Sequence, residues 1–253
     1  TTGTTSVAVG EDALGAQTTG TRNTAVGYNA GLLVTTGNYN VAVGTFALDK
    51  ATTANSNTSI GDASLSLLTT GASNVAVGQN AAASMTTGAS NVAVGEGALD
   101  AAETTSNNVA VGAASMGVAT TAPSNVAIGK SSLGALTTGS AVGENTAVGH
   151  QSAAALTTGY RNVAVGGYAL DAATSAQNNT ACGWAALSAS TTASNNTGVG
   201  SSSLIACTTG TGNTALGYNS LVSVTTGANN VGIGYQAADA VTTGQDNHAF
   251  GDN

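Results

Sequence analysis

The chain has 253 residues, of which only 6% are charged and 4% aromatic, and its formal net charge is −8. Soluble globular proteins usually carry about 25% charged residues, so this composition does not predict an ordinary globular domain. The basic residues Arg22, Lys50, Lys130 and Arg161 are dispersed, which argues against nucleic-acid binding, and no apolar run approaches the roughly 20 residues of a membrane span.

A 17-residue repeat begins at Ser6 and organises the chain to its end. The Asn of the phrase "NVAVG" is taken as the first position of a unit. One step, from Asn125 to Asn145, is 20 residues long, which places a three-residue insertion within 140–144. The units begin at Ser6, Asn23, Asn40, Asn57, Asn74, Asn91, Asn108, Asn125, Asn145, Asn162, Asn179, Asn196, Asn213 and Asn230, and a truncated unit begins at Asn247. The repeat predicts one continuous domain over residues 1–253 and an insertion that loops outward.

Each unit predicts one short strand at its first residues, beginning near residue 6 and recurring to residue 251. The second and fourth positions are mostly Val, Ile or Thr, which are typical of strands. The fifth position is Gly in every copy, from Gly10 to Gly251. Such strictness indicates either a positive φ or the close approach of another backbone. Glycines and the short repeat argue against a pair of packed helices.

The remainder of each unit is expected to fold back over the strand and turn into the next unit at "TTG". The ninth position is mostly Leu and the twelfth mostly apolar, so both are expected inside, together with the second and fourth. One coil cannot bury its apolar face alone, but stacked coils can. The sequence therefore predicts an all-β protein, a parallel β-solenoid of about fourteen 17-residue coils. The recurring Asn indicates either a hydrogen-bonded ladder or a simple turn preference.

The third position is always Ala, Ser or Gly and, by strand alternation, is expected to point away from the interior. A position that faces solvent would accept large polar residues, so we expect another part of the protein or another chain to pack closely on this row. Another sheet of the same coil is one candidate, and a neighbouring chain is the favoured one. The candidate inter-chain seam comprises Ala93, Ala110, Ala127 and Ala164.

The unit "NVAVGxxA" resembles the N-S-V-A-I-G-x-x-S repeat of the YadA-like heads of trimeric autotransporter adhesins. Units with "TTG" spacers are also similar to repeats of bacteriophage tail-fibre proteins. The resemblance covers Ser6 to Asn253. It implies a left-handed β-roll, a homotrimer of side-by-side chains, an extracellular, cell-surface or virion location, and a role in attachment to a glycan or protein receptor. The longer coils, and the lack of a coiled-coil stalk, neck or membrane anchor, depart from full-length adhesins.

No arrangement of residues predicts catalysis, a metal or a cofactor, so a non-enzymatic protein is expected. Four Asp residues share the tenth position but lie three or four coils apart, roughly 14–20 Å at strand spacing, too far for a paired-carboxylate site. They are Asp49, Asp100, Asp171 and Asp239. His150 and His248 are six coils apart, and no Cys/His cluster indicates zinc. Cys182 and Cys207 fall in neighbouring units, where they are either a disulfide or two small apolar residues.

The sixth position varies most in charge and size, which indicates exposure. It carries the candidate surface contact column Tyr28, His150, Trp184, Tyr218 and Tyr235. Exposed aromatic rings stack on sugar rings or bury against a partner, so a carbohydrate-binding fibre is one alternative function. Scattered surface aromatics and lateral chain contacts are other interpretations.

The Thr pairs, such as Thr35–Thr36 and Thr52–Thr53, recur in nearly every unit. Regular Thr arrays are typical of ice-binding solenoids, which is a second alternative, although only one Thr of each pair is expected to point outward. The chain begins without Met and both begins and ends within a unit. We therefore expect that it is processed or a fragment, and that the rod continues through further residues or by end-to-end stacking.

Overall fold

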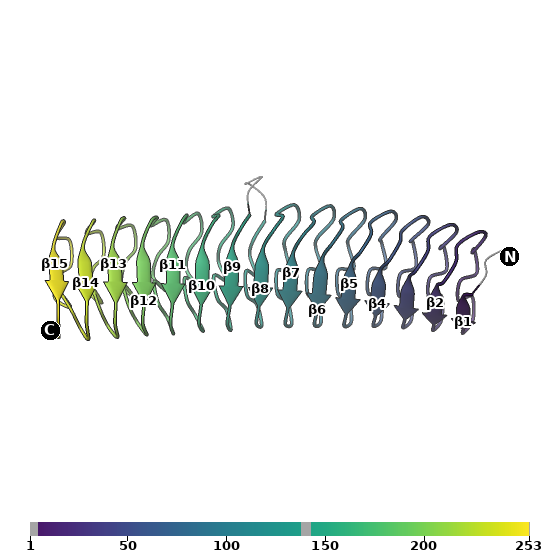
Figure 1. Ribbon diagram of the computed structural model, residues 1–253, viewed down its shortest axis with the longest axis horizontal. Helices are drawn as coiled ribbons and strands as arrows, with labels where there is room; N and C mark the ends of the chain where they lie inside the picture. The colour runs from purple at the N-terminus through teal and green to yellow at the C-terminus, as the bar shows by residue number, and fades with distance from the viewer. Residues whose placement is uncertain (1–4, 138–142, 253) are drawn as a thin grey trace. The chain divides into compact units, whose positions relative to one another are not determined.

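The computed structural model describes residues 5–137 and 143–252. The described residues form fifteen short parallel strands and no helix, in coils of about 17 residues, which confirms the predicted β-solenoid (Figure 1). The chain divides into two compact units: the first unit is Thr1–Pro123 and the second unit is Ser124–Asn253. Each 17-residue repeat within them forms one coil, and the word unit below refers only to these two parts of the chain.

Every strand has three residues and occupies the second to fourth positions of its repeat. The strands of the first unit are β1 (Val7–Val9), β2 (Thr24–Val26), β3 (Val41–Val43), β4 (Thr58–Ile60), β5 (Val75–Val77), β6 (Val92–Val94) and β7 (Val109–Val111). Those of the second unit are β8 (Val126–Ile128), β9 (Thr146–Val148), β10 (Val163–Val165), β11 (Thr180–Cys182), β12 (Thr197–Val199), β13 (Thr214–Leu216), β14 (Val231–Ile233) and β15 (His248–Phe250).

Within each unit, neighbouring strands pair in parallel and in chain order. The register joins equivalent positions of successive coils, so Val126 of β8 lies opposite Thr146 of β9 across the 20-residue step. The ladder therefore resumes in phase after the insertion, as predicted. The expected outward loop falls mainly on residues 140–142, which lie outside the described residues.

The third-position side chains point into the coil, contrary to the predicted orientation. Ala93 and Ala164 have 0% exposure in the single chain, whereas Val75 and Val163, at the second position, are 36% and 39% exposed. The third-position side chains are all small because the interior of the coil is narrow. A Cβ added at the third-position Gly232 would lie 2.7 Å from Ser220 Oγ and 2.9 Å from Leu221 Cγ.

The prediction of an inter-chain seam on the third-position row is therefore wrong. From β2 to β14, its side chains are buried and have no surface to offer a second chain, because they fill the space between their own strand and the returning segment of the coil. The four seam residues are all at 0% exposure: Ala93, Ala110, Ala127 and Ala164. The outward positions are instead the second and fourth, which had been expected inside.

The ninth and twelfth positions form the apolar core, as predicted. Leu65 and Leu68 are fully buried in one coil, and Leu99 and Leu133 are buried in others. The small eighth-position residues, such as Ala98, are buried beside them. Each coil thus contributes one or two large apolar side chains, and stacking of the coils joins them into one core within each unit.

The backbone turns sharply because three positions of nearly every coil adopt a left-handed conformation. In the coil that begins at Asn74, these are Asn80 (φ 55°), Ala82 (φ 52°) and Ser90 (φ 59°). Left-handed residues other than Gly cost about 1–2 kcal/mol each, so the burial and hydrogen bonds of the coil must offset this strain. The sequence analysis did not predict these positions.

The invariant fifth-position Gly has both properties that the sequence left as alternatives. Gly78 has a φ of +134°, and a Cβ added there would lie 2.6 Å from the carbonyl oxygen of Gly95 in the next coil. Only Gly adopts this φ readily, and only Gly permits the neighbouring backbone to approach so closely. This residue therefore sets the distance between coils directly after each strand.

Candidate functional site

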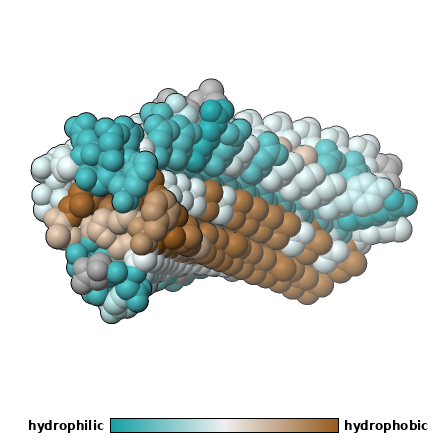
Figure 2. Space-filling model, turned by 60° about the vertical axis from the view of Figure 1, so that its left-hand side comes forward, coloured by the Kyte–Doolittle hydropathy of each residue, from teal (hydrophilic) through white to brown (hydrophobic). Residues whose placement is uncertain are grey.

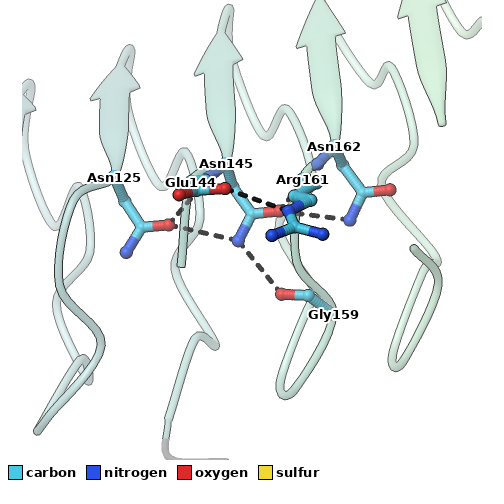
Figure 3. Close-up of polar contacts among 6 residues, drawn as sticks. All are labelled: Asn125, Glu144, Asn145, Gly159, Arg161 and Asn162. Atoms are coloured by element: carbon cyan, nitrogen blue, oxygen red, sulfur yellow. Dashed lines mark hydrogen bonds and ion pairs between the residues drawn. The ribbon is translucent and has the colours of Figure 1, made fainter. Parts of the chain in front are cut away.

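The leading Asn residues form a buried hydrogen-bond ladder, which confirms one of the two interpretations of their recurrence. In the second unit, the backbone N and Nδ2 of Asn145 donate to Oδ1 of Asn125, both at 3.1 Å (Figure 3). Nδ2 of Asn145 also donates to the carbonyl of Gly159 at 3.0 Å. Asn162 repeats the pattern on Oδ1 of Asn145. Asn145 thus bonds to the Asn residues of both neighbouring coils and ties its strand to the Gly of "TTG" in its own coil.

The ladder predicts a large loss of stability when one amide is removed from the first unit. Oδ1 of Asn74 accepts from N and Nδ2 of Asn91 at 3.0 and 3.1 Å, and Nδ2 of Asn74 donates to the carbonyl of Gly88 at 2.9 Å. Asn74→Ala leaves these buried groups without that partner, so we expect a loss of about 3 kcal/mol in the free energy of unfolding, measured by denaturant titration.

Asn80→Ala is the matched control, because Asn80 is an exposed amide of the same coil. Its left-handed conformation is shared by alanine at the equivalent positions Ala63 and Ala114. We expect a change below about 1 kcal/mol. Equal stabilities of the two variants would show that the buried ladder contributes nothing beyond a turn preference.

The outward face of the strands is an apolar surface in both units. At the fourth position, every residue is apolar or Cys, and none is buried. The fourth-position column comprises Val9, Val26, Val43, Ile60, Val77, Val94 and Val111 in the first unit, and Ile128, Val148, Val165, Cys182, Val199, Leu216, Ile233 and Phe250 in the second. The second position beside it is Val or Thr in every coil up to the last, where it is His248. Figure 2 shows hydrophobic rows of this kind crossing successive coils.

The sixth-position residues lie at the surface, as their variability predicted. Tyr28, Trp184, Tyr218 and Tyr235 are 46%, 57%, 49% and 52% exposed. The structure does not assemble the whole candidate contact column into one site, because Tyr28 and His150 lie in coils apart from the others; only Tyr218 and Tyr235 are in adjacent coils. His150 makes an edge contact with Tyr168, with ring centroids 5.4 Å apart.

Two further ring pairs involve residues of this column, one in the first unit and one in the second. Tyr28 contacts Phe46 edge to face at 5.5 Å in the first unit. Tyr218 and Tyr235 stack in adjacent coils of the second unit, with centroids 5.4 Å and planes 16° apart. Phe46 and Tyr168 occupy the seventh position, which the sequence analysis did not single out, although their aromatic character next to the sixth position was a usable signal.

The two Thr residues of each pair differ in their hydrogen bonds. Oγ1 of Thr35 donates to the carbonyl of Thr52 at 2.9 Å, and Oγ1 of Thr157 donates to that of Thr174 at 2.9 Å. The hydroxyl of the first Thr thus forms a hydrogen bond to the next coil. The second Thr of the pair, such as Thr36, is exposed and forms the single outward column expected from alternation.

The ionisable residues form no catalytic arrangement among the described residues. Arg161 Nε lies 3.0 Å from Glu144 Oε2 in an exposed ion pair (Figure 3), and Lys50 Nζ lies 3.2 Å from Asp49 Oδ2. Partial burial raises the pKa of the Asp100 carboxyl above its ordinary value. In the described ranges, no group of three or more His, Cys, Asp or Glu side chains could hold a metal ion.

Both cysteines are free thiols in different surroundings, so the structure does not place them in a disulfide. Cys182 is exposed in the fourth-position column. Cys207 is buried at the twelfth position, and desolvation raises the pKa of its thiol to about 11. Thiolates are the reactive form, so only Cys182 is expected to react near neutral pH.

Comparisons with protein-family models, with curated proteins and with solved structures found no match to this chain. The described residues contain no helix long and apolar enough to cross a membrane.

Proposed function

We propose that the chain is a non-enzymatic rod module of an extracellular fibre, as in a surface adhesin or phage tail fibre, which acts in attachment. Within that fibre, parallel copies associate through the outward strand face. The observation that carries the proposal is the uninterrupted apolar fourth-position column of each unit. The resemblance of the repeat to trimeric adhesin heads and tail fibres supports an assembly of three chains.

The extent of this face supports its role as an interface. Three residues at about 3.3 Å along each strand and about 4.8 Å between strands give roughly 48 Å² per coil. The seven strands of the first unit thus present about 340 Å² of flat surface. The largest apolar patch on a typical soluble monomer is about 300–600 Å² and is often functional, so this face reaches that size within one unit.

A second copy of the chain fits this face better than an irregular partner does. The columns repeat once per coil, so another solenoid in parallel register presents the same apolar row at the same spacing. A single coil contributes little, since stable interfaces bury about 800 Å² per partner. Association is therefore cumulative over many coils, and a regular repeat is the simplest way to build it.

Cys182 offers a test of the parallel register, because it is the exposed thiol within the proposed interface. Parallel copies in register bring equivalent residues together around the common axis. We expect oxidation or a short bis-maleimide to link Cys182 to Cys182 and to yield a covalent dimer on denaturing gels. Light scattering is expected to give a trimer mass before cross-linking.

Two variants make the cross-linking result decisive. Cys182→Ser is expected to abolish the covalent dimer, since Cys207 is buried. Adding Thr192→Cys to that variant places a thiol on the exposed turn of the same coil instead of on the strand, and little cross-linking is expected. A folded monomer of 24.0 kDa in sedimentation would contradict the proposed assembly.

A further inference from the structure

We infer that the second unit carries a binding slot for one ring of a neutral saccharide, between Trp184 and Tyr218. These residues occupy the sixth position two coils apart, and Ser201 occupies it in the coil between them. Two large exposed rings thus flank one small polar residue. This inference is independent of the proposed assembly, because it concerns a different column of the surface.

The backbone holds these three residues in even steps. The N–H of Ser202 donates to the carbonyl of Trp184 at 2.9 Å, and the N–H of Asn219 donates to the carbonyl of Ser201 at 3.1 Å. The sixth positions are therefore fixed one coil apart, as the strands are. The backbone spacing of the slot is therefore set before a ligand binds, and the cost of binding is limited to ordering the two side chains.

On the side away from Ser201, the two flanking rings have different surroundings. The nearest atom to a Cβ added at Gly167, in the preceding coil, would be Cδ1 of Trp184 at 3.7 Å, so the indole leans over a position without a side chain. Tyr218 stacks on Tyr235 in the following coil. Trp184 and Tyr218 nevertheless remain 57% and 49% exposed. Between the two rings, the sixth position carries only the small side chain of Ser201, so the space over Ser201 is open to a ligand.

The spacing suits a single sugar ring. The backbone positions that carry Trp184 and Tyr218 are two coil steps apart, about 9.5 Å at the spacing of parallel strands, and the lean of the indole towards Gly167 adds to the gap between the rings. Apolar contact on both faces of a flat ring takes about 7–8 Å, since carbon atoms in contact lie about 3.5–4.0 Å apart. A puckered pyranose ring is thicker than a flat ring and occupies the remainder.

The surrounding chemistry selects a neutral ligand. No Lys, Arg or His lies between Arg161 and His248 in the sequence, and the chain carries a net charge of −8, which disfavours phosphates and acidic sugars. Hydroxyl and amide groups of Ser201, Ser202 and Asn219 stand at the sixth and seventh positions beside the rings. Aromatic faces with a few neutral polar groups are suited to the C–H faces and hydroxyls of a sugar.

Trp184 is the only Trp of the chain, so its fluorescence reports on this slot alone. The experiment titrates the full chain with neutral hexasaccharides of glucose, mannose, galactose and N-acetylglucosamine, and with a hexamer of galacturonic acid. We expect a saturable change in Trp emission at millimolar concentrations of at least one neutral hexasaccharide, and none with the acidic one. Absence of a response to all four neutral sugars would overturn the inference.

Three variants locate the binding. Ser201→Tyr fills the slot with a side chain that the sixth position already accepts at Tyr218 and Tyr235, so the fold is retained and binding is expected to be lost. Tyr218→Ala is expected to weaken binding by roughly tenfold or more, the loss of one stacking face. Ala113→Tyr, at an exposed sixth position of the first unit, is the matched control and leaves binding unchanged.

Circular dichroism and sedimentation of the same samples separate this inference from the proposed assembly. Unchanged sugar binding by folded Ser201→Tyr would overturn the slot, whatever the oligomeric state. A change in Trp emission that follows protein concentration and not sugar concentration would show that a second copy covers the column, which also overturns it. A monomer that binds the sugar would instead contradict only the proposed assembly.

Discussion

Gly78→Ala is expected to destabilise the first unit by about 4 kcal/mol or more, and to lower its yield as soluble protein. The added Cβ would lie 2.6 Å from the carbonyl oxygen and 2.7 Å from the carbonyl carbon of Gly95. It would also sit on a backbone with a φ of +134°, which residues with a side chain rarely adopt. Because the overlap is with backbone, relief requires the two coils to separate and to weaken their hydrogen bonds.

Gly97→Ala provides a control in the neighbouring coil. Gly97 has a φ of +59°, but a Cβ added there meets no atom within 4 Å. Ala63 and Ala114 already occupy this seventh position with φ values of 53°. We expect a change of about 1 kcal/mol or less. Thermal unfolding followed by circular dichroism compares the variants, and equal losses would show that close approach of the coils is not the reason for the invariant Gly.

The repeat made the strands, the register and the core predictable, because each depends on periodicity alone. The "NVAVG" phrase marked every strand, and Leu65 and Leu68 were expected in the interior from their positions after the Gly. The insertion before Asn145 left the frame intact, which the spacing of the flanking Asn residues already indicated. The exposure of Trp184 followed from the variability of its column.

Which face of each strand points into the coil was not predictable from alternation. Alternation shows which residues share a face but not which face lies inside. Hydrophobicity favoured Val163 and Val165 inside and Ala164 outside. The space opposite the strand decides the outcome: it is already filled by the returning segment, so only a hydrogen, a methyl group or, at Ser59, a hydroxymethyl group fits at the third position. The left-handed positions were equally hard to predict, since residues such as Leu65 (φ 46°) rarely adopt that backbone conformation.

Ala164 and Val163 are adjacent residues of β10 with opposite orientations, and glutamate at each is expected to have opposite consequences. Ala164 has 0% exposure and Val163 is 39% exposed. Ala164→Glu places a carboxylate in a core that lacks both volume and a partner for it, so we expect a loss of about 4 kcal/mol or more and unfolding of the second unit. Circular dichroism and proteolysis would report this loss even in a monomer.

Val163→Glu is expected to remain folded but to prevent association of the chains. Its neighbours in the second-position column are Thr146 and Thr180, which leave room for a longer side chain. In an assembled fibre, however, three glutamates would meet within an apolar interface without a counter-charge, and desolvation would penalise each of them. Light scattering is expected to give monomers with an unchanged circular dichroism spectrum. If Val163→Glu assembles as the parent chain does, this face is not the interface; if Ala164→Glu folds normally, the third-position row is not the core.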